Sequence, residues 1–354
     1  MRRLACVLLV VGCAGAPAGT APVGVDPGEA GSGSGGGSGS GSGSGAGSGS
    51  GSPSAVPDVR CSGTPDAGPA GSFNHLSSEL ISAAGDPKHR GFDLVAPASA
   101  AEQTLEGWIS YTVLDKALED EDVDVFACRA SAWQKLGTAR TDSEGHFALT
   151  LTGADRLPIA LRDMYVSVVG DRTGTSFFAY VAPDGSPLAV SDVDGTLTSS
   201  ENAFFDTIVT GGEPDAQPGA AAAFATAATR GFQAVYVTAR GNQYTADTRQ
   251  WLADQGFPRG PLRLSPSFVT LPGGDTIDYK TQTITALEAG MTVAVGIGNR
   301  DSDITAYANA MVPADRIYIK LPEYQSECQA DLDANKAVGF MAYDDLRTMY
   351  VPSW

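Results

Sequence analysis

Residues 188–196 read LAVSDVDGT, and this stretch decides the fold of the second half of the chain. The run Leu188 to Ser191 is short and apolar, which is typical of a buried strand. Two carboxylates follow it, Asp192 and Asp194, and Gly195 permits a tight turn behind them. Ligands bind at the carboxyl ends of parallel strands, so the stretch predicts a site as well as a strand.

Strands and helices alternate from this point onward. Apolar strand patterns recur at 233–237, 262–264, 292–297 and 316–319, with helical patterns at 218–230, 244–255, 280–289 and 302–310. Such alternation predicts a parallel sheet covered by helices on both faces. We therefore expect an α/β domain with a doubly wound parallel sheet over residues 185–354.

The two aspartates suit phosphoryl transfer. Asp192 can act as a nucleophile toward phosphorus and form an aspartyl-phosphate. Asp194 can protonate the leaving oxygen and then activate water. Two carboxylates this close are ionised together only beside a cation, which implies Mg²⁺. The alternative is an acidic turn without chemistry.

The strand at 233–237 is followed by donors for a phosphoryl group. Thr238 can donate a hydrogen bond, and Arg240 adds a charged donor. Lys280 starts the next predicted helix and can neutralise the phosphoryl group and Asp192. The alternatives are a helix cap for Thr238 and an exposed surface position for Lys280.

The strand at 292–297 is followed by oxygen ligands. Asn299 and Asp303 offer hard oxygen atoms for the same Mg²⁺ that Asp192 and Asp194 would bind. Asp301, between them, can instead cap the helix.

These residues carry a family resemblance. Asp192-x-Asp194-Gly-Thr196, Thr238, Lys280 and the run from Gly298 to Asp303 resemble the four motifs of the haloacid dehalogenase superfamily. Within it, the stretches 191–200 (SDVDGTLTSS), 236–266 and 296–308 resemble the C-terminal domain of lipin phosphatidate phosphatases and of retinal degeneration B type phosphatidylinositol-transfer proteins. The resemblance covers roughly residues 88–325 and includes the segment before this domain.

The resemblance implies phosphatidic acid as the ligand. Lipins hydrolyse it, whereas the related domain of the transfer proteins is thought to bind it without catalysis and lacks the second Asp of the motif. Asp194 and Thr196 are both present here, which favours an enzyme. The superfamily usually has Asp where this chain has Asn299, but lipins also have Asn there.

Carried over by position, the resemblance gives each motif residue a role. Asp192 is the nucleophile and a Mg²⁺ ligand, and Asp194 is the acid/base with its backbone carbonyl on the metal. Thr238 and Lys280 hold the phosphoryl group. Thr196 and Arg240 are further candidates for binding it, and Asn299 and Asp303 are the remaining candidate Mg²⁺ ligands.

The N-terminus is typical of an export signal. Basic residues at 1–3 precede an apolar run at 4–11, and the segment ends Gly12-Cys13. This ending resembles the lipobox of bacterial lipoproteins; the alternative is an ordinary signal peptide that is cut nearby. We predict a signal peptide at 1–12, lipid attachment at Cys13 and a lipid-anchored location in the bacterial cell envelope, at the outer membrane or in the periplasm.

Three segments separate Cys13 from the α/β domain. Residues 31–52 are almost only Gly and Ser, so residues 13–71 are predicted as a lipidated Cys and a disordered linker. A helical pattern over 72–84 predicts a helical lead-in at 72–103. Short alternating strands with turn residues between them predict a small β-sandwich at 104–184, with a structural or docking role.

Charge and cysteine content limit the partners. With 23 basic and 41 acidic residues the net charge is −18, which argues against nucleic acid as a partner. Without Cys6 and Cys13, three cysteines remain, Cys61, Cys128 and Cys328. Export permits one disulfide between two of them, and the sequence does not determine which pair.

Three functions follow as hypotheses. The first is a membrane-tethered, Mg²⁺-dependent phosphatase that acts on phosphatidic acid or another phosphate monoester. The second is a non-catalytic module on the cell envelope that binds phosphatidic acid or phosphoinositide. The third is a cell-surface structural protein whose β domain is the active surface.

Overall fold

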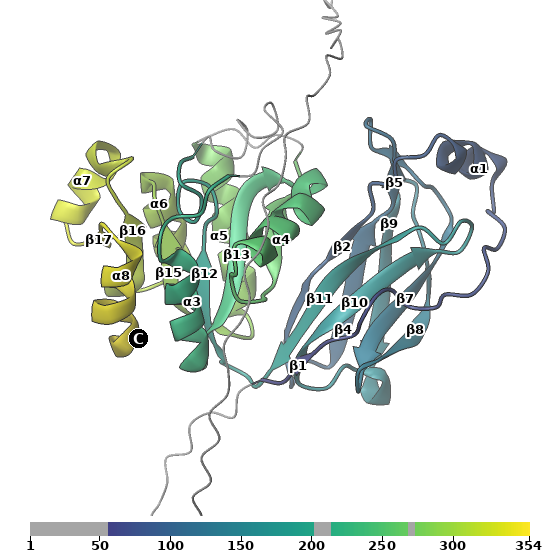
Figure 1. Ribbon diagram of the computed structural model, residues 1–354, viewed down its shortest axis with the longest axis horizontal. Helices are drawn as coiled ribbons and strands as arrows, with labels where there is room; N and C mark the ends of the chain where they lie inside the picture. Colours follow the sequence, from purple (N-terminus) through teal and green to yellow (C-terminus); the bar gives the residue numbers. More distant parts are fainter. Residues whose placement is uncertain (1–55, 202–213, 268–272) are drawn as a thin grey trace, which may run out of the picture. The chain divides into compact units, whose positions relative to one another are not determined.

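The computed structural model describes residues 56–201, 214–267 and 273–354 (Figure 1). The predicted signal peptide, Cys13 and the Gly/Ser tract lie outside these residues. None of the helices within the described ranges combines the length and the apolar character that a bilayer span requires.

The first folded part is a β-sandwich. One sheet has the order β3-β11-β10-β7-β8, with β1 beside β10, and the other has the order β2-β4-β9. Side chains from both sheets form one core around Leu105, Val125, Met164 and Phe177, all of which are buried. The strands of the first sheet are β1 (Asp58–Val59), β3 (Leu94–Pro97), β7 (Asp122–Arg129), β8 (Ala132–Arg140), β10 (Ala160–Val168) and β11 (Gly174–Ala182). The strands of the second sheet are β2 (Arg90–Phe92), β4 (Glu102–Trp108) and β9 (His146–Thr152). A separate two-stranded sheet is formed by β5 (Ser110–Tyr111) and β6 (Lys116–Ala117).

The sandwich begins earlier than the sequence patterns predict. The predicted helical lead-in holds a single helix, α1 (Leu76–Ala83), and then β2, β3 and the start of β4. The prediction of a disordered linker up to residue 71 is wrong for residues 56–71. In that stretch β1 pairs with β10, so its backbone hydrogen bonds are made to the sheet rather than to water.

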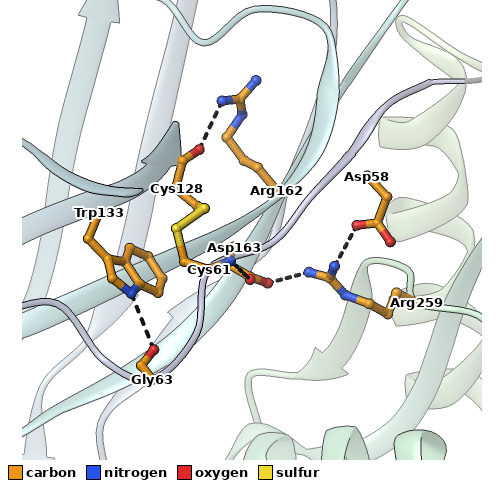
Figure 2. Close-up of a disulfide and its surroundings, with 8 residues drawn as sticks. All are labelled: Asp58, Cys61, Gly63, Cys128, Trp133, Arg162, Asp163 and Arg259. Carbon is orange, nitrogen blue, oxygen red and sulfur yellow. Dashed lines mark hydrogen bonds and ion pairs between the residues drawn. A yellow bond between two sulfur atoms is a disulfide. The ribbon is translucent and has the colours of Figure 1, made fainter. Parts of the chain in front are cut away.

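A disulfide holds this N-terminal stretch on the sandwich. Cys61, just after β1, is bonded to Cys128 at the end of β7, and Cys328 is a buried free thiol. Beside the disulfide, the carboxylate of Asp163 accepts a hydrogen bond from the backbone N–H of Cys61 (Figure 2). The predicted single disulfide is therefore present, and its pairing is Cys61 with Cys128.

The second folded part is the predicted parallel sheet. Its order is β14-β13-β12-β15-β16-β17, and every neighbouring pair is parallel. The strand before the two aspartates, β12, lies at the centre between β13 and β15. The strands are β12 (Pro187–Ser191), β13 (Gln233–Gly241), β14 (Leu262–Ser265), β15 (Thr292–Gly298), β16 (Ile317–Lys320) and β17 (Val338–Phe340).

Helices cover both faces of this sheet (Figure 1). The core on one face joins the strands to Ile284 of α5 and Ile304 of α6, and that on the other joins them to Phe224 of α3 and Trp251 of α4. Two cores on opposite faces are what a doubly wound sheet requires. The helices are α3 (Ala220–Thr229), α4 (Thr245–Asp254), α5 (Gly274–Glu288), α6 (Asp301–Asn309), α7 (Gln325–Asp333) and α8 (Tyr343–Asp345).

Charged contacts join the sandwich to the sheet domain. The buried carboxylate of Asp93 accepts hydrogen bonds from the Arg249 side chain and from the backbone N–H groups of Phe178 and Leu262. The guanidinium of Arg259 contacts the carboxylates of Asp58 and Asp163 (Figure 2).

Candidate active site

The site lies where the central strands of the parallel sheet end. Asp192 follows β12 directly, and its backbone N–H donates to the carbonyl of Ile297 on β15. This contact brings the segment after β12 against the segment after β15, which carries Asn299. Asp192 and Asn299 are both buried, at 5% and 1% exposure.

Lys280 is inside the site and not on the surface. The sequence places it at a helix start, but α5 begins at Gly274, and Lys280 lies in its second turn. Its Nζ donates to Oδ1 of Asp192 at 2.8 Å and to Oδ1 of Asp303 at 2.6 Å. Burial acts to lower the pKa of Lys280, but these two carboxylates raise it well above its usual value. Lys280 is therefore charged at neutral pH.

Asp194 turns toward β13. Its two carboxylate oxygens accept hydrogen bonds from the guanidinium of Arg240 at 2.6 to 3.0 Å, and Oδ2 also accepts one from Thr238 at 2.9 Å. Arg240 is held in turn by the hydroxyl of Thr248. The two residues expected to bind a phosphoryl group thus hold the second aspartate of the motif.

Thr196 links Asp192 to Asn299. Its Oγ1 lies 3.3 Å from Oδ2 of Asp192 and 3.2 Å from Oδ1 of Asn299, so both oxygens face the same hydroxyl. The carbonyl of Thr196 accepts a hydrogen bond from the buried hydroxyl of Tyr343, which fixes the turn. Thr196 itself is fully buried.

Asp303 has partners for both of its oxygens. Oδ1 accepts from Lys280, and Oδ2 accepts from the backbone N–H groups of Asn299 and Arg300. These contacts fix the loop between β15 and α6. Asp303 belongs to the cluster, as the sequence predicts, but in this arrangement it orients Lys280 and the loop.

Glu201 is a site residue that the sequence reasoning missed. Its Oε2 accepts a hydrogen bond from Nδ2 of Asn299 at 3.0 Å. Burial raises the pKa of Glu201 to about 7, with the carboxylates of Asp194 and Asp303 acting in the same direction, while the Asn299 hydrogen bond and Lys280 lower it. No motif spacing marks this residue, and the only signal in the sequence is an acidic side chain seven residues after Asp194.

The cluster has an excess of negative charge. Its ion pairs and hydrogen bonds connect five carboxylates with three cations. The carboxylates are Asp192, Asp194, Glu201, Asp303 and Glu327. The cations are Lys280, Arg240 and Arg300. Burial raises the pKa of Asp192 well above its usual range; Lys280 opposes this, and the nearby carboxylates add to it. A divalent cation would balance this excess.

The oxygen atoms of Asp192 and Asn299 suit such a cation. In the described part of the chain, no three His, Cys, Asp or Glu side chains converge as a metal cluster. A Mg²⁺ ion bound here would rest on a mixed set: a carboxylate oxygen of Asp192, the amide oxygen of Asn299 and backbone or water oxygens. Hard oxygen ligands with few protein carboxylates are what Mg²⁺ accepts.

Comparison with known families gives matches for both folded parts. Residues 87–181 match the model "PITM 1-3, beta-sandwich domain", and residues 189–320 match the model "PITM 1-3, LNS2 domain". The two matches follow the order of the sandwich and the parallel-sheet domain described above.

Individual relatives agree with these matches. The mouse (Mus musculus) membrane-associated phosphatidylinositol transfer protein 3 is 26% identical over 248 residues, which cover 68% of this chain and 24% of the relative. The Drosophila melanogaster protein retinal degeneration B is 26% identical over 235 residues, 65% of this chain and 18% of the relative. The chain thus spans about a quarter or less of the length of these relatives.

A solved structure is similar at a lower level. The class C acid phosphatase from Bacillus anthracis has 19% identity and a TM-score of 0.30, over 47% of this chain and 68% of that one, which is too low to carry an argument. The two family models and the relatives carry the assignment instead: over its β-sandwich and its parallel-sheet domain, this chain is similar to the LNS2-containing segment of membrane-associated phosphatidylinositol transfer proteins.

Proposed function

We propose that the parallel-sheet domain is a haloacid dehalogenase-like, Mg²⁺-dependent phosphomonoester hydrolase with phosphatidic acid as its preferred substrate. The observation that carries this is the buried carboxylate of Asp192, which contacts Lys280 through Oδ1 and Thr196 through Oδ2 at the end of the central strand. A nucleophile needs such a fixed position and a cation beside it.

The proposed chemistry has two steps. A carboxylate oxygen of Asp192 attacks phosphorus, the bond from phosphorus to the ester oxygen breaks, and Asp194 supplies the proton that the leaving alcohol takes up. Water then attacks the phosphorus of the aspartyl-phosphate and Asp194 takes a proton from that water. The bond between phosphorus and the Asp192 oxygen breaks, so phosphate is released and Asp192 is again a free carboxylate. Lys280 and Thr196 orient Asp192 throughout. Bound Mg²⁺ would supply electrostatic stabilisation of the phosphoryl oxygens.

The experiment is a phosphate-release assay on the full chain, because β1 and Cys61 are part of the sandwich. Dioctanoyl phosphatidic acid and p-nitrophenyl phosphate are supplied with Mg²⁺ or with EDTA. Turnover is expected with Mg²⁺ only, and Asp192→Asn should abolish it. Asp254→Asn, an exposed aspartate that accepts a hydrogen bond from Gln250 at the end of α4, is the matched control. Equal rates for wild type and Asp192→Asn would reject the proposal.

A non-catalytic phospholipid-binding module is the second candidate. One contact favours it: both oxygens of Asp194, the group that must pass the proton, accept hydrogen bonds from Arg240. The mouse relative is also named as a phosphatidylinositol transfer protein. This candidate predicts that phosphatidic acid vesicles are bound equally by wild type and by Asp194→Asn, without phosphate release by either.

We further propose that the chain is exported and anchored to the cell envelope through a lipid on Cys13. The disulfide between Cys61 and Cys128 supports export, because disulfides persist in oxidising compartments. Cys13→Ser should move the protein from the membrane fraction to the soluble fraction after expression in a bacterium. An unchanged membrane fraction would contradict the anchor.

A further inference from the structure

The side chain of Asn299 has two chemically different ends. An amide can bind a cation only through its oxygen, because its NH₂ group carries two donors and no lone pair for a metal. An aspartate in the same place presents an oxygen in either orientation. The usefulness of Asn299 to a cation therefore depends on which way its amide points.

The contact with Glu201 fixes that orientation. Nδ2 of Asn299 donates to Oε2 of Glu201 at 3.0 Å. Oδ1 lies 3.2 Å from Oγ1 of Thr196, whose single proton can be given to this oxygen or to Oδ2 of Asp192, so this contact fits either orientation of the amide. The reversed amide would place its oxygen against the Glu201 carboxylate and its NH₂ toward Asp192 and Thr196. Since a carboxylate is an acceptor, Glu201 selects the orientation in which the amide oxygen faces Asp192.

The contact packs against the backbone of the aspartate motif. Gly195 has a φ of +66°, and a Cβ added there would lie 2.1 Å from Nδ2 of Asn299 and 2.8 Å from Oε2 of Glu201. The amide and the carboxylate thus pack directly onto the turn of the aspartate motif. Glu201 is held from the other side by Arg300, whose NH1 lies 3.9 Å from Oε1.

We propose that Glu201 is a positioning residue for the divalent-cation site: it orients the Asn299 amide so that its oxygen, and not its NH₂ group, joins Asp192 at the ion. This inference rests on the cation site of the proposed function, and it adds a residue that does not itself bind the ion. Partners in such a position change metal affinity by about 10- to 100-fold in known sites.

A double-mutant cycle tests the inference without any turnover. The probe is Mn²⁺, and free Mn²⁺ is measured by electron paramagnetic resonance as it is titrated into the purified full chain. Four proteins form the cycle: wild type, Glu201→Ala, Asn299→Asp and the double variant. Glu201→Ala should weaken Mn²⁺ binding about tenfold beside the native Asn299. In the N299D background the same change should cause no loss, because a carboxylate needs no orientation.

Glu201→Gln is the control for charge and folding. Its side-chain oxygen can still accept from Nδ2 of Asn299, so Mn²⁺ affinity should stay within about threefold of wild type. A loss of affinity on Glu201→Ala in both backgrounds would mean that Glu201 is itself a ligand, and would overturn the inference. No loss in the native background, or no Mn²⁺ binding by wild type, would overturn it as well.

Phosphate release is measured in parallel to separate the two proposals. If the cycle gives the expected pattern while no substrate is turned over, the positioning role of Glu201 stands and the hydrolase proposal falls. If substrate is turned over with Mg²⁺ and the cycle shows no coupling, the hydrolase proposal stands and the positioning role of Glu201 falls.

Discussion

The Nζ atom of Lys280 lies 2.8 Å from Oδ1 of Asp192, and both side chains are buried at 7% exposure. The ammonium group comes from α5 on one face of the sheet, and the carboxylate comes from the end of β12. A charge pair in this position fixes the second oxygen of Asp192 toward Thr196. The pair therefore fixes the position of the Asp192 carboxylate.

Removing the cation from this pair is predicted to destabilise the domain. Lys280→Met leaves Asp192 and Asp303 buried together without a counter-charge, which should lower the free energy of unfolding by about 3–5 kcal/mol. Urea unfolding of the variant measures this loss. Lys336→Met, which breaks an exposed pair with Asp331, is the control and should cost about 1 kcal/mol or less. Equal losses for the two variants would contradict the central role of Lys280.

The sequence predicts most of the residues that converge in this site, with the exception of Glu201. Asp192 and Asp303 are far apart along the chain, but they follow parallel strands that end at the same edge of the sheet, so their approach follows from the strand pattern. Lys280 lies in the second turn of α5, and the family resemblance rather than the strand pattern places it in the site. Most strands and helices between residues 187 and 320 lie within about two residues of their predicted ranges, because they have a clear apolar periodicity. The exceptions are α5, which begins at Gly274 and not at 280, and β13, which continues to Gly241, and the elements after residue 320 were not predicted.

The partners of individual atoms could not be predicted. Arg240 has a guanidinium that suits a phosphate and a carboxylate equally, and only the fold shows that it binds Asp194. Glu201 lies outside every motif, and its contact with Asn299 depends on the turn at Gly195. The sandwich was placed too late because β1 and β2 have only two and three residues, too few to show a period.

Gly195 is predicted to be required for two separable reasons. Its φ of +66° disfavours any side chain, and a Cβ would meet Asn299 at 2.1 Å. Gly195→Ala should therefore abolish Mn²⁺ binding and phosphate release. Gly256→Ala is the matched control, because it has a φ of +75° with no atom within 4 Å of an added Cβ. Gly256→Ala should lower the free energy of unfolding by only about 1–2 kcal/mol, which is what a side chain costs in this backbone conformation. It should keep both Mn²⁺ binding and phosphate release. Similar losses of Mn²⁺ binding and phosphate release in both variants would show that the backbone conformation of the glycine, and not the contact with Asn299, causes the loss.

The disulfide is predicted to stabilise the sandwich. It closes a loop with a sequence separation of 67 residues, for which the chain-entropy model gives about 4 kcal/mol. The double variant Cys61→Ala/Cys128→Ala should lose a similar amount in urea unfolding. Dithiothreitol should lower wild type to the stability of this variant and leave the variant unchanged. A wild type that is insensitive to the reductant would show that β1 is held by its strand pairing alone.

His89 is predicted to make the sandwich less stable in mild acid. The side chain is 8% exposed, and burial lowers its pKa from 6.5 to about 4, assisted by Arg90 and opposed by Asp171 and the backbone of Ser110. Between these two values the unfolded chain binds a proton that the folded chain does not. Stability from this residue is thus present above pH 6.5 and is lost as the pH falls toward 4, by about 3 kcal/mol in total.

The change in the pH profile isolates this effect from other titrating groups. The free energy of unfolding of wild type is measured in urea from pH 7 to pH 4.5 and compared with that of His89→Gln, which cannot take up the proton. The difference between the two should shrink steadily across this range, because only wild type carries the penalty. A His89→Gln profile that runs parallel to that of wild type would show that His89 is protonated in the folded sandwich as readily as in the unfolded chain, and that burial does not exclude the charge.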